Sequence, residues 1–242
     1  MFNELWKPLE EMLKTVTKVN EEYNKMHVGD MFSKDVINSF DIERAVEGAK
    51  RKLVSECIRT VLKKKNVANV DVSNEVHEKF VKEEGFDETK IEAFLVENYV
   101  AKADAIAHEQ ILKEAQKLLN TIWIAGMGSR LPRIDEFVKK EKMTLEVNWS
   151  FGSIDFRDID AIKAFEKLIA IVLDKQTPAT ARPFGLGDTI NNARKTFDFS
   201  QATSYIADNK YVTECRVYKN GKFEVKFSKE YYARKVAKAL IS

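Results

Sequence analysis

Residues that interrupt secondary structure are scarce in this chain and gather in a few places. Its 242 residues include only 9 glycines and 4 prolines, about half of the average share. Long uninterrupted segments favour helices over a sandwich of many short strands and turns. The apolar content of 44% is enough for a full core, so we expect a folded protein of one large or two small domains.

Apolar residues in the first 120 positions recur every three or four residues, which is the spacing of amphipathic helices. We expect a first helix over residues 4–25, a second after a Ser39 or Asp41 cap, and a long helical segment after an Asp87 or Thr89 cap. The apolar positions of the first helix are Leu5, Leu9, Met12, Val16, Val19 and Tyr23.

The pattern changes at a cluster of glycine and proline over residues 126–132. Alternating apolar and polar residues over 143–149 predict a strand, and a helix capped by Asp158 is expected to follow. We therefore predict a helical region over residues 1–125 and an α+β region over residues 126–242. The expected fold class is α+β, with a helical N-terminal half and a small antiparallel sheet, covered by helices, in the C-terminal half.

The clearest local signal is Asn220-Gly221, which lies between two alternating strands and predicts a hairpin. A three-residue loop with a left-handed Gly221 puts apolar pairs on one face and oppositely charged pairs on the other. The expected pairs are Val217 with Phe223, Cys215 with Val225, Thr213 with Phe227, Arg216 with Glu224 and Glu214 with Lys226. A two-residue loop mixes charged and core residues on one face and is rejected. Ser228 is expected to cap a final helix.

Motifs for metal or nucleotide chemistry are incomplete. His77 and His108 each begin a His-Glu string, but the second histidine of a zinc-protease motif is missing from both. Asp104 and His108 could share a metal on one helical face, but no further ligand is near them in the sequence. Gly126 and Gly128 lack the third glycine of a dinucleotide-binding turn and are better explained by a helix end. We therefore assign no metal site and no cofactor.

The sequence Glu224-Val225-Lys226 supports the one enzymatic alternative. Metal-dependent nucleases often hold magnesium with a strand Glu-x-Lys and an upstream acidic residue, for which Asp208 or Glu214 is available. The preferred hairpin register instead gives Glu224 and Lys226 charge partners on a solvent face. No catalytic residue is assigned, and Glu224 with Lys226 is the alternative, as a magnesium-dependent nuclease.

Charge is distributed unevenly, although 40 Lys and Arg nearly balance 38 Asp and Glu. The net charge is −3 over residues 1–150 and +5 over residues 151–242, and the segment from Lys210 onward carries +6. A basic hairpin and helix with exposed Tyr211, Tyr218 or Tyr231 could follow a phosphate backbone, and the acidic half could bind a protein. The candidate binding residues are Arg216, Lys219, Lys222, Lys229, Arg234, Lys235 and Lys238.

The hairpin also carries a family resemblance. The sequence RVYKNG at positions 216–221, followed by Phe227 and a closing helix, resembles the pattern of the uncharacterised domain of unknown function family 4942, which is found in phages, plasmids and other mobile elements. The sequence LDK at 173–175 resembles its Leu-Asp-Gly-Lys element without the glycine, and residues 137–147 are similar in placement to its lysine-rich strand. The similarity extends from about Asp87 to the end of the chain.

Two positions depart from the family pattern, since Lys222 and Glu224 stand where members often have Asn and His. The resemblance implies a mobile-element accessory protein without an assigned reaction. We expect a non-enzymatic phage or mobile-element protein that binds a host protein or a nucleic acid, in counter-defence or regulation. The expected location is the cytoplasm, because Cys57 and Cys215 form no disulfide framework and no membrane segment or signal peptide is recognised.

Overall fold

The computed structural model describes residues 2–26, 39–83, 85–119, 122–124, 128–150, 153–196 and 209–242. These residues form an α+β protein with a helical N-terminal half and a small antiparallel sheet in the C-terminal half, as predicted. Contacts divide the chain into two compact units. The first unit contains Met1–Val67 and Asp71–Lys102, and the second contains Ala68–Val70 and Ala103–Ser242. None of the described helices is long and apolar enough to cross a membrane.

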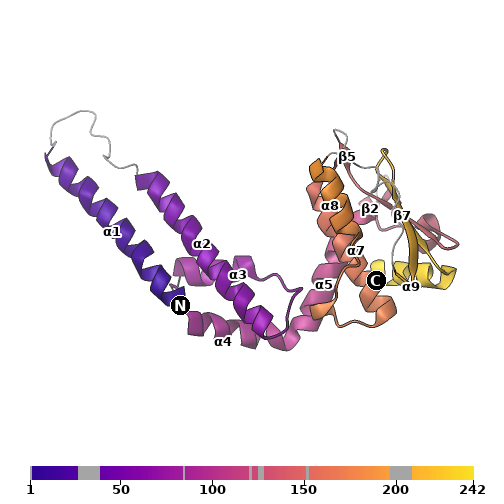
Figure 1. Ribbon diagram of the computed structural model, residues 1–242, viewed down its shortest axis with the longest axis horizontal. Coiled ribbons are helices and arrows are strands. Elements are labelled where there is room, and N and C mark those ends of the chain that lie inside the picture. Colours follow the sequence, from indigo (N-terminus) through magenta and orange to yellow (C-terminus); the bar gives the residue numbers. More distant parts are fainter. Residues whose placement is uncertain are drawn as a thin grey trace. The chain divides into compact units, whose positions relative to one another are not determined.

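The first unit consists of helices (Figure 1). Its elements are α1 (Phe2–Met26), α2 (Ser39–Lys64), α3 (Ser73–His77), the π-helical turn η1 (Glu78–Glu83), α4 (Glu88–Asn98) and the 3₁₀ turn η2 (Val100–Lys102). The long helices α1 and α2 pack side by side and run in opposite directions. The Asp87 carboxylate accepts the backbone N–H groups of Thr89 and Lys90, which confirms Asp87 as the cap of α4. The predicted long helical segment is interrupted at η2.

The second unit contains the remaining elements. They are α5 (Ala103–Ala115), η3 (Gln116–Leu118), β1 (Ile122–Ile124), β2 (Gly128–Arg130), α6 (Ile134–Phe137), β3 (Val138–Lys139), β4 (Lys142–Glu146), β5 (Trp149–Ser150), β6 (Ser153–Ile154), α7 (Phe156–Asp174), η4 (Pro178–Thr180), α8 (Leu186–Thr196), β7 (Val212–Val217), β8 (Lys222–Phe227) and α9 (Glu230–Leu240). The boundary between the units differs from the predicted one at residue 125, because α5 packs against α7 and belongs to the second unit.

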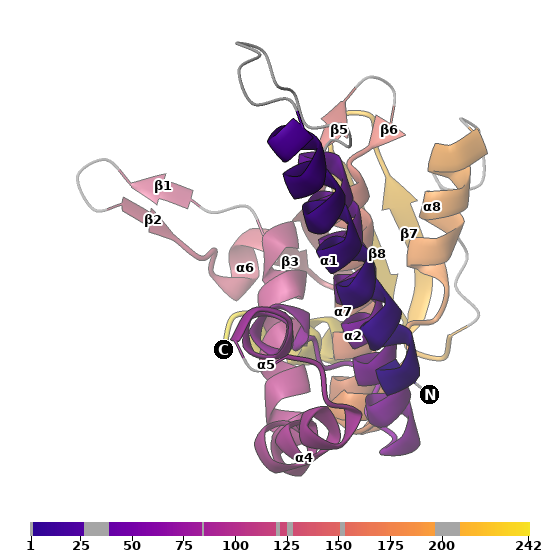
Figure 2. The same ribbon diagram turned by 90° about the vertical axis from the view of Figure 1, so that its left-hand side faces the viewer.

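The main sheet of the second unit has the strand order β3-β4-β8-β7, and each neighbouring pair is antiparallel. Alternate residues of β8 are buried, so one face of the sheet forms part of the core and the other is accessible to solvent. The helices α7 and α9 lie against the buried face (Figures 1 and 2). The hydroxyl of Tyr211, next to β7, donates to the Leu173 carbonyl at the end of α7, with an O···O distance of 2.9 Å. Tyr211 is therefore buried, and the expectation that it is exposed was wrong for this tyrosine.

The β7–β8 hairpin confirms the predicted loop and most of the predicted register. Gly221 has φ +83°, and four pairs are as expected, from Val217 with Phe223 to Glu214 with Lys226. The last pair was wrong, because Phe227 pairs with Val212 and the register shifts between Val212 and Glu214. The oppositely charged residues stand opposite one another across the strands as expected. Arg216 bonds to Glu214 on its own strand, and Glu224 bonds to Lys222 on its own strand.

Three predicted caps or helix ends were wrong. Asp155, not Asp158, caps α7, because its carboxylate accepts the N–H of Arg157; Asp158 is buried and accepts the N–H of Asn148. The Ser228 hydroxyl donates to the Lys210 carbonyl, and Lys229 occupies the cap position of α9 without a side-chain bond. The segment leading to Gly128 is a short hairpin of β1 and β2, not the end of a helix.

The N-terminus of α8 is capped from another helix. The Glu166 carboxylate, on α7, accepts the backbone N–H groups of Leu186 and Gly187, with N···O distances of 2.8 and 3.0 Å. Glu166 is completely buried, and burial raises its pKa against the lowering effect of these N–H donors. This carboxylate thus supplies the acceptors that the first turn of α8 requires.

Candidate functional site

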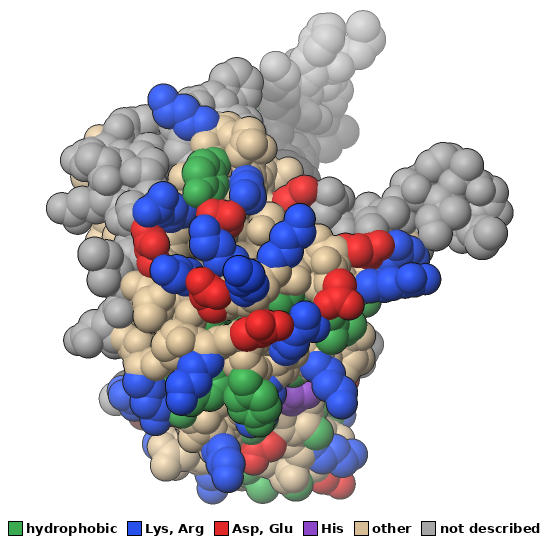
Figure 3. Space-filling model, turned by 90° about the vertical axis from the view of Figure 1, so that its right-hand side faces the viewer, with side chains coloured by type: hydrophobic (Ala, Val, Ile, Leu, Met, Phe, Trp, Pro, Cys, Tyr) green, Lys and Arg blue, Asp and Glu red, His purple; other side chains and the backbone are tan. Residues whose placement is uncertain are grey.

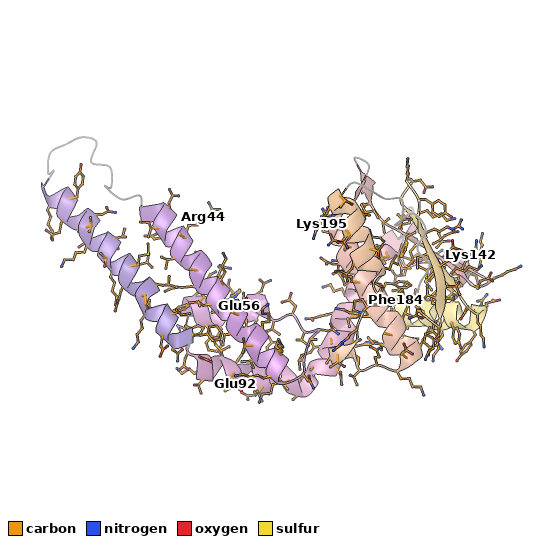
Figure 4. All side chains as sticks on the ribbon, viewed as in Figure 1. Arg44, Glu56, Glu92, Lys142, Phe184 and Lys195 are labelled. Carbon is orange, nitrogen blue, oxygen red and sulfur yellow. The ribbon has the colours of Figure 1, made fainter. Side chains whose placement is uncertain are left out.

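The solvent face of the main sheet brings together basic residues that are distant in the sequence. Lys139 of β3 pairs with Lys142 of β4, and Lys142 pairs with Lys226 of β8. We call Lys139, Lys142 and Lys226 the lysine row, because the cross-strand pairing places them directly opposite one another on three adjacent strands. Lys142 points outward from the sheet, away from α7 and α8 (Figure 4). Neighbouring strands are about 4.8 Å apart, so the row extends over about 10 Å.

The charges of the lysine row are not balanced by ion pairs. Among the described residues, no carboxylate forms an ion pair with Lys139, Lys142 or Lys226. The nearest carboxylates on the same face have other partners: Glu214 accepts from the Arg216 guanidinium at 2.6 Å and Glu224 from the Lys222 ammonium at 2.8 Å. Like charges directly opposite one another destabilise a sheet. The Lys139–Lys142 and Lys142–Lys226 pairs are therefore unfavourable, whereas Lys226 also stands opposite Glu214. An anionic ligand would relieve the two unfavourable pairs.

Glu224 lies on the same face of the sheet, and its carboxylate accepts two side-chain hydrogen bonds. It accepts from the Lys222 ammonium and from the Tyr218 hydroxyl, both at 2.8 Å. The bond from Lys222 lowers the pKa of Glu224; burial opposes it with a smaller effect, and the bond from Tyr218 adds a further, smaller lowering. Lys142 also lowers this pKa by its charge.

The nuclease alternative requires a second acidic residue beside Glu224. One candidate, Glu214, is bonded to Arg216; the other, Asp208, lies outside the described residues. Within the described ranges, no group of three or more His, Cys, Asp or Glu side chains is arranged to hold a metal ion. Glu224 and Lys226 both lie on the solvent face of the sheet.

The predicted binding residues of the hairpin lie at the opposite end of the same face from the lysine row or in the turn. Arg216 and Lys222 are engaged by Glu214 and Glu224, and these bonds raise the pKa of each cation. Lys219 is exposed in the turn. Only Lys219 of these three has a charge without an ion pair in the described part of the chain.

The predicted binding residues of the last helix are exposed on α9, as expected. Arg234 is bonded to Glu230 and to Asp135, with distances of 2.8 and 2.9 Å. Lys235 and Lys238 follow Tyr231 by four and seven residues, so they share its side of the helix; Tyr231 is 66% exposed. Lys229 is also exposed, with its ammonium 5.8 Å from the Tyr232 ring centroid.

The structure therefore separates the predicted set into two surfaces. The side of α9 that carries Val236 and Leu240 packs into the core on the buried face of the sheet, so its basic side points away from that face. The hairpin residues lie on the other face of the sheet. Figure 3 shows that Lys and Arg are intermixed with Asp and Glu on one side of the second unit, rather than forming a continuous basic surface.

Sequence reasoning missed two members of the lysine row, Lys139 and Lys142. A local signal for the pairing of Lys142 with Lys226 does not exist, because the two strands are far apart in the chain and no hairpin joins them. The short turn between Lys139 and Lys142, with Lys140 in the left-handed region at φ +54°, is the only local feature that could have indicated the first pair.

The other residues considered from the sequence have structural partners. The His77 ring Nε2 lies 3.0 Å from the Arg51 carbonyl and 3.1 Å from the Ser55 hydroxyl, and burial lowers its pKa. The Asp104 carboxylate accepts the Ala179 N–H at 2.9 Å. These bonds connect α3 to α2 and α5 to η4. His77 and Asp104 thus take part in packing contacts, each within its own unit.

No family model, curated protein or solved structure matches the chain. The resemblance of residues 216–221 to the domain of unknown function family 4942 accordingly stays a prediction.

Proposed function

We propose that this protein is a cytoplasmic accessory protein of a phage or other mobile element and that it binds nucleic acid through its second unit. The origin and the location come from the family resemblance and the cysteine usage. The binding activity is supported by one observation, the lysine row of Lys139, Lys142 and Lys226 on the solvent face of the sheet.

A phosphate backbone fits the lysine row physically. The row spans about the Debye length at 0.1 M salt, so its three ammonium groups act together on a chain of phosphates. Neutralising phosphates releases counterions, which makes the affinity strongly dependent on salt. The mutual repulsion of the lysines in the free protein is then replaced by attraction in the complex.

The test is binding of fluorescently labelled single-stranded DNA, duplex DNA and single-stranded RNA over a range of salt concentrations. Replacing Lys139, Lys142 and Lys226 together by Gln should reduce the slope of log affinity against log salt by about 2–3. The matched control replaces Lys52, Lys63 and Lys64, which are exposed on α2, and changes the net charge equally. This control should leave most of the affinity intact.

The triple variant loses two like-charged cross-strand pairs and one oppositely charged pair, Lys226 with Glu214, each worth about 0.2–1 kcal/mol, so the stability of the sheet should change little. Urea unfolding of the triple variant measures this directly. The proposal is rejected if none of the nucleic acids binds at low salt, or if the triple variant and the α2 control bind equally well.

The magnesium-dependent nuclease remains the competing function, and a separate cleavage experiment tests it. The protein is incubated with each nucleic acid and magnesium, together with Glu224→Gln and the exposed control Glu109→Gln. Binding without cleavage is expected from the bonded state of Glu224. Cleavage that is lost only in Glu224→Gln would establish the nuclease instead.

A further inference from the structure

The apolar residues of α1 follow a seven-residue repeat. Spacings of three and four alternate along the whole helix, through Phe2, Leu5, Leu9, Met12, Val16, Val19 and Tyr23. Such a repeat places the residues on a single seam, as in helices that pair lengthwise with another helix. The first unit contains one long neighbour for this seam, α2.

α2 covers only one edge of the seam. Trp6, Val16 and Asn20 are buried, and Trp6 is further held by stacking on Phe86, with ring centroids 5.0 Å apart. The other edge consists of Leu5, Met12 and Val19, which are 51%, 48% and 40% exposed. We call these three residues the α1 stripe. They are seven residues apart and form a line of about 21 Å along the helix.

We propose that the α1 stripe binds the α1 stripe of a second copy of this chain, with the two helices antiparallel. A two-fold axis at Met12 brings each Met12 against its copy and each Leu5 against Val19 of the second chain. The contact is isologous, so every apolar residue of the stripe finds an apolar counterpart. The proposal concerns the first unit and does not depend on nucleic-acid binding by the second.

Charge complementarity favours a second copy in the antiparallel direction. The residues immediately before Leu5, Met12 and Val19 are Glu4, Glu11 and Lys18, so all three flank the same edge of the stripe. All three are exposed, and none forms an ion pair among the residues that the structure describes. With the two-fold axis at Met12, each Glu4 lies within two residues, about 3 Å, of the level of Lys18 of the other chain and on the same side of the contact. The two Glu11 residues also face one another, so two attractive pairs oppose one repulsive pair. A parallel arrangement places these residues on opposite sides of the contact and forms neither attractive pair.

Sedimentation velocity of the full chain over a range of concentrations tests the association. A reversible dimer is expected because the stripe is narrow, and Met12→Asp should weaken it at least about tenfold. Thr17→Asp adds the same charge on an exposed position nearly opposite the stripe and should leave the dimer unchanged. Circular dichroism of both variants should match that of the original chain, because Met12 and Thr17 are exposed. A chain that stays monomeric, or a dimer that Met12→Asp does not weaken, overturns the proposal.

Disulfide trapping tests the direction. Leu5→Cys and Val19→Cys are prepared as separate variants, and Cys57 and Cys215 do not interfere because both are buried. A mixture of the two variants should form the mixed dimer at least about tenfold faster than either variant forms a dimer alone. Faster cross-linking of either variant with itself would show parallel helices and overturn the antiparallel arrangement.

Discussion

The helices α1 and α7 have the same kind of sequence pattern but very different surroundings. Both carry apolar residues every three or four positions. On α7, Ile162, Phe165 and Leu168 are at most 1% exposed, whereas Leu5 and Met12 on α1 are about half exposed. The reason is the number of neighbours, since α7 packs on α5, α8 and α9 and α1 packs mainly on α2. Periodicity thus shows that a helix has an apolar face, but it does not show how much of that face is covered.

The largest expected effect contrasts these two faces directly. Phe165→Ala removes a fully buried ring from the core of the second unit and should reduce the free energy of unfolding by about 3–5 kcal/mol. Met12→Ala, on the exposed stripe, should change it by less than about 0.5 kcal/mol in dilute monomer. Urea unfolding of both variants measures the difference. Equal losses would show that the stripe is covered within the chain.

The two cysteines allow each unit to be followed separately in the same experiment. Cys57 is buried in the first unit, where burial raises the pKa of its thiol to about 11; Cys215 is buried in the second, and burial raises its pKa as well. Both thiols are therefore protonated and shielded at neutral pH, and labelling requires local opening. Phe165→Ala should accelerate labelling of Cys215 much more than that of Cys57. Equal acceleration would mean that the two units open together.

A smaller effect, opposite in sign for the two units, is expected at two glycines. Gly221 has φ +83°, and an added Cβ would lie 2.5 Å from the Val147 carbonyl oxygen, so Gly221→Ala should cost about 2–3 kcal/mol. Gly48 lies within α2 with nothing within 4 Å of an added Cβ. Gly48→Ala should therefore stabilise the first unit by about 0.5–1 kcal/mol. Thermal unfolding measures both, and a neutral Gly221→Ala would contradict the tight turn.

Local features of the fold were predictable from the sequence, and non-local ones were not. The Asp87 cap, the helix over α1 and four pairs of the β7–β8 register follow from residues a few positions apart, because side-chain spacing and turn chemistry act locally. The bulge between Val212 and Glu214 was missed, since nothing in the strand pattern marks it. The same limit applies to the candidate site. Lys219 and Arg216 were identifiable as basic hairpin residues, whereas the lysine row depends on β4 pairing with β8.

The cap of α8 shows the same limit in a buried residue. Glu166 is a polar residue within the apolar face of α7. Its position is explained only by Leu186 and Gly187, which follow it by 20 and 21 residues in the chain and donate their N–H groups to its carboxylate. Among the described residues, the buried acidic side chains are Asp158 and Glu166, and both are in the second unit. Burial raises both pKa values. The two units should therefore differ in how their stability responds to pH.

The smallest expected effect is the contribution of Glu166 to that response. Because its pKa is raised in the folded state, the folded chain holds the proton more tightly than the unfolded chain. The stabilisation is complete below the ordinary glutamate pKa and is lost as the pH rises through the raised value. Glu166→Gln keeps an oxygen acceptor for α8 and removes this titration.

The free energy of unfolding of the original chain, measured relative to Glu166→Gln from about pH 4 to about pH 8, should thus decrease as pH rises. A difference that increases with pH would mean that the N–H donors of α8 outweigh burial at this carboxylate.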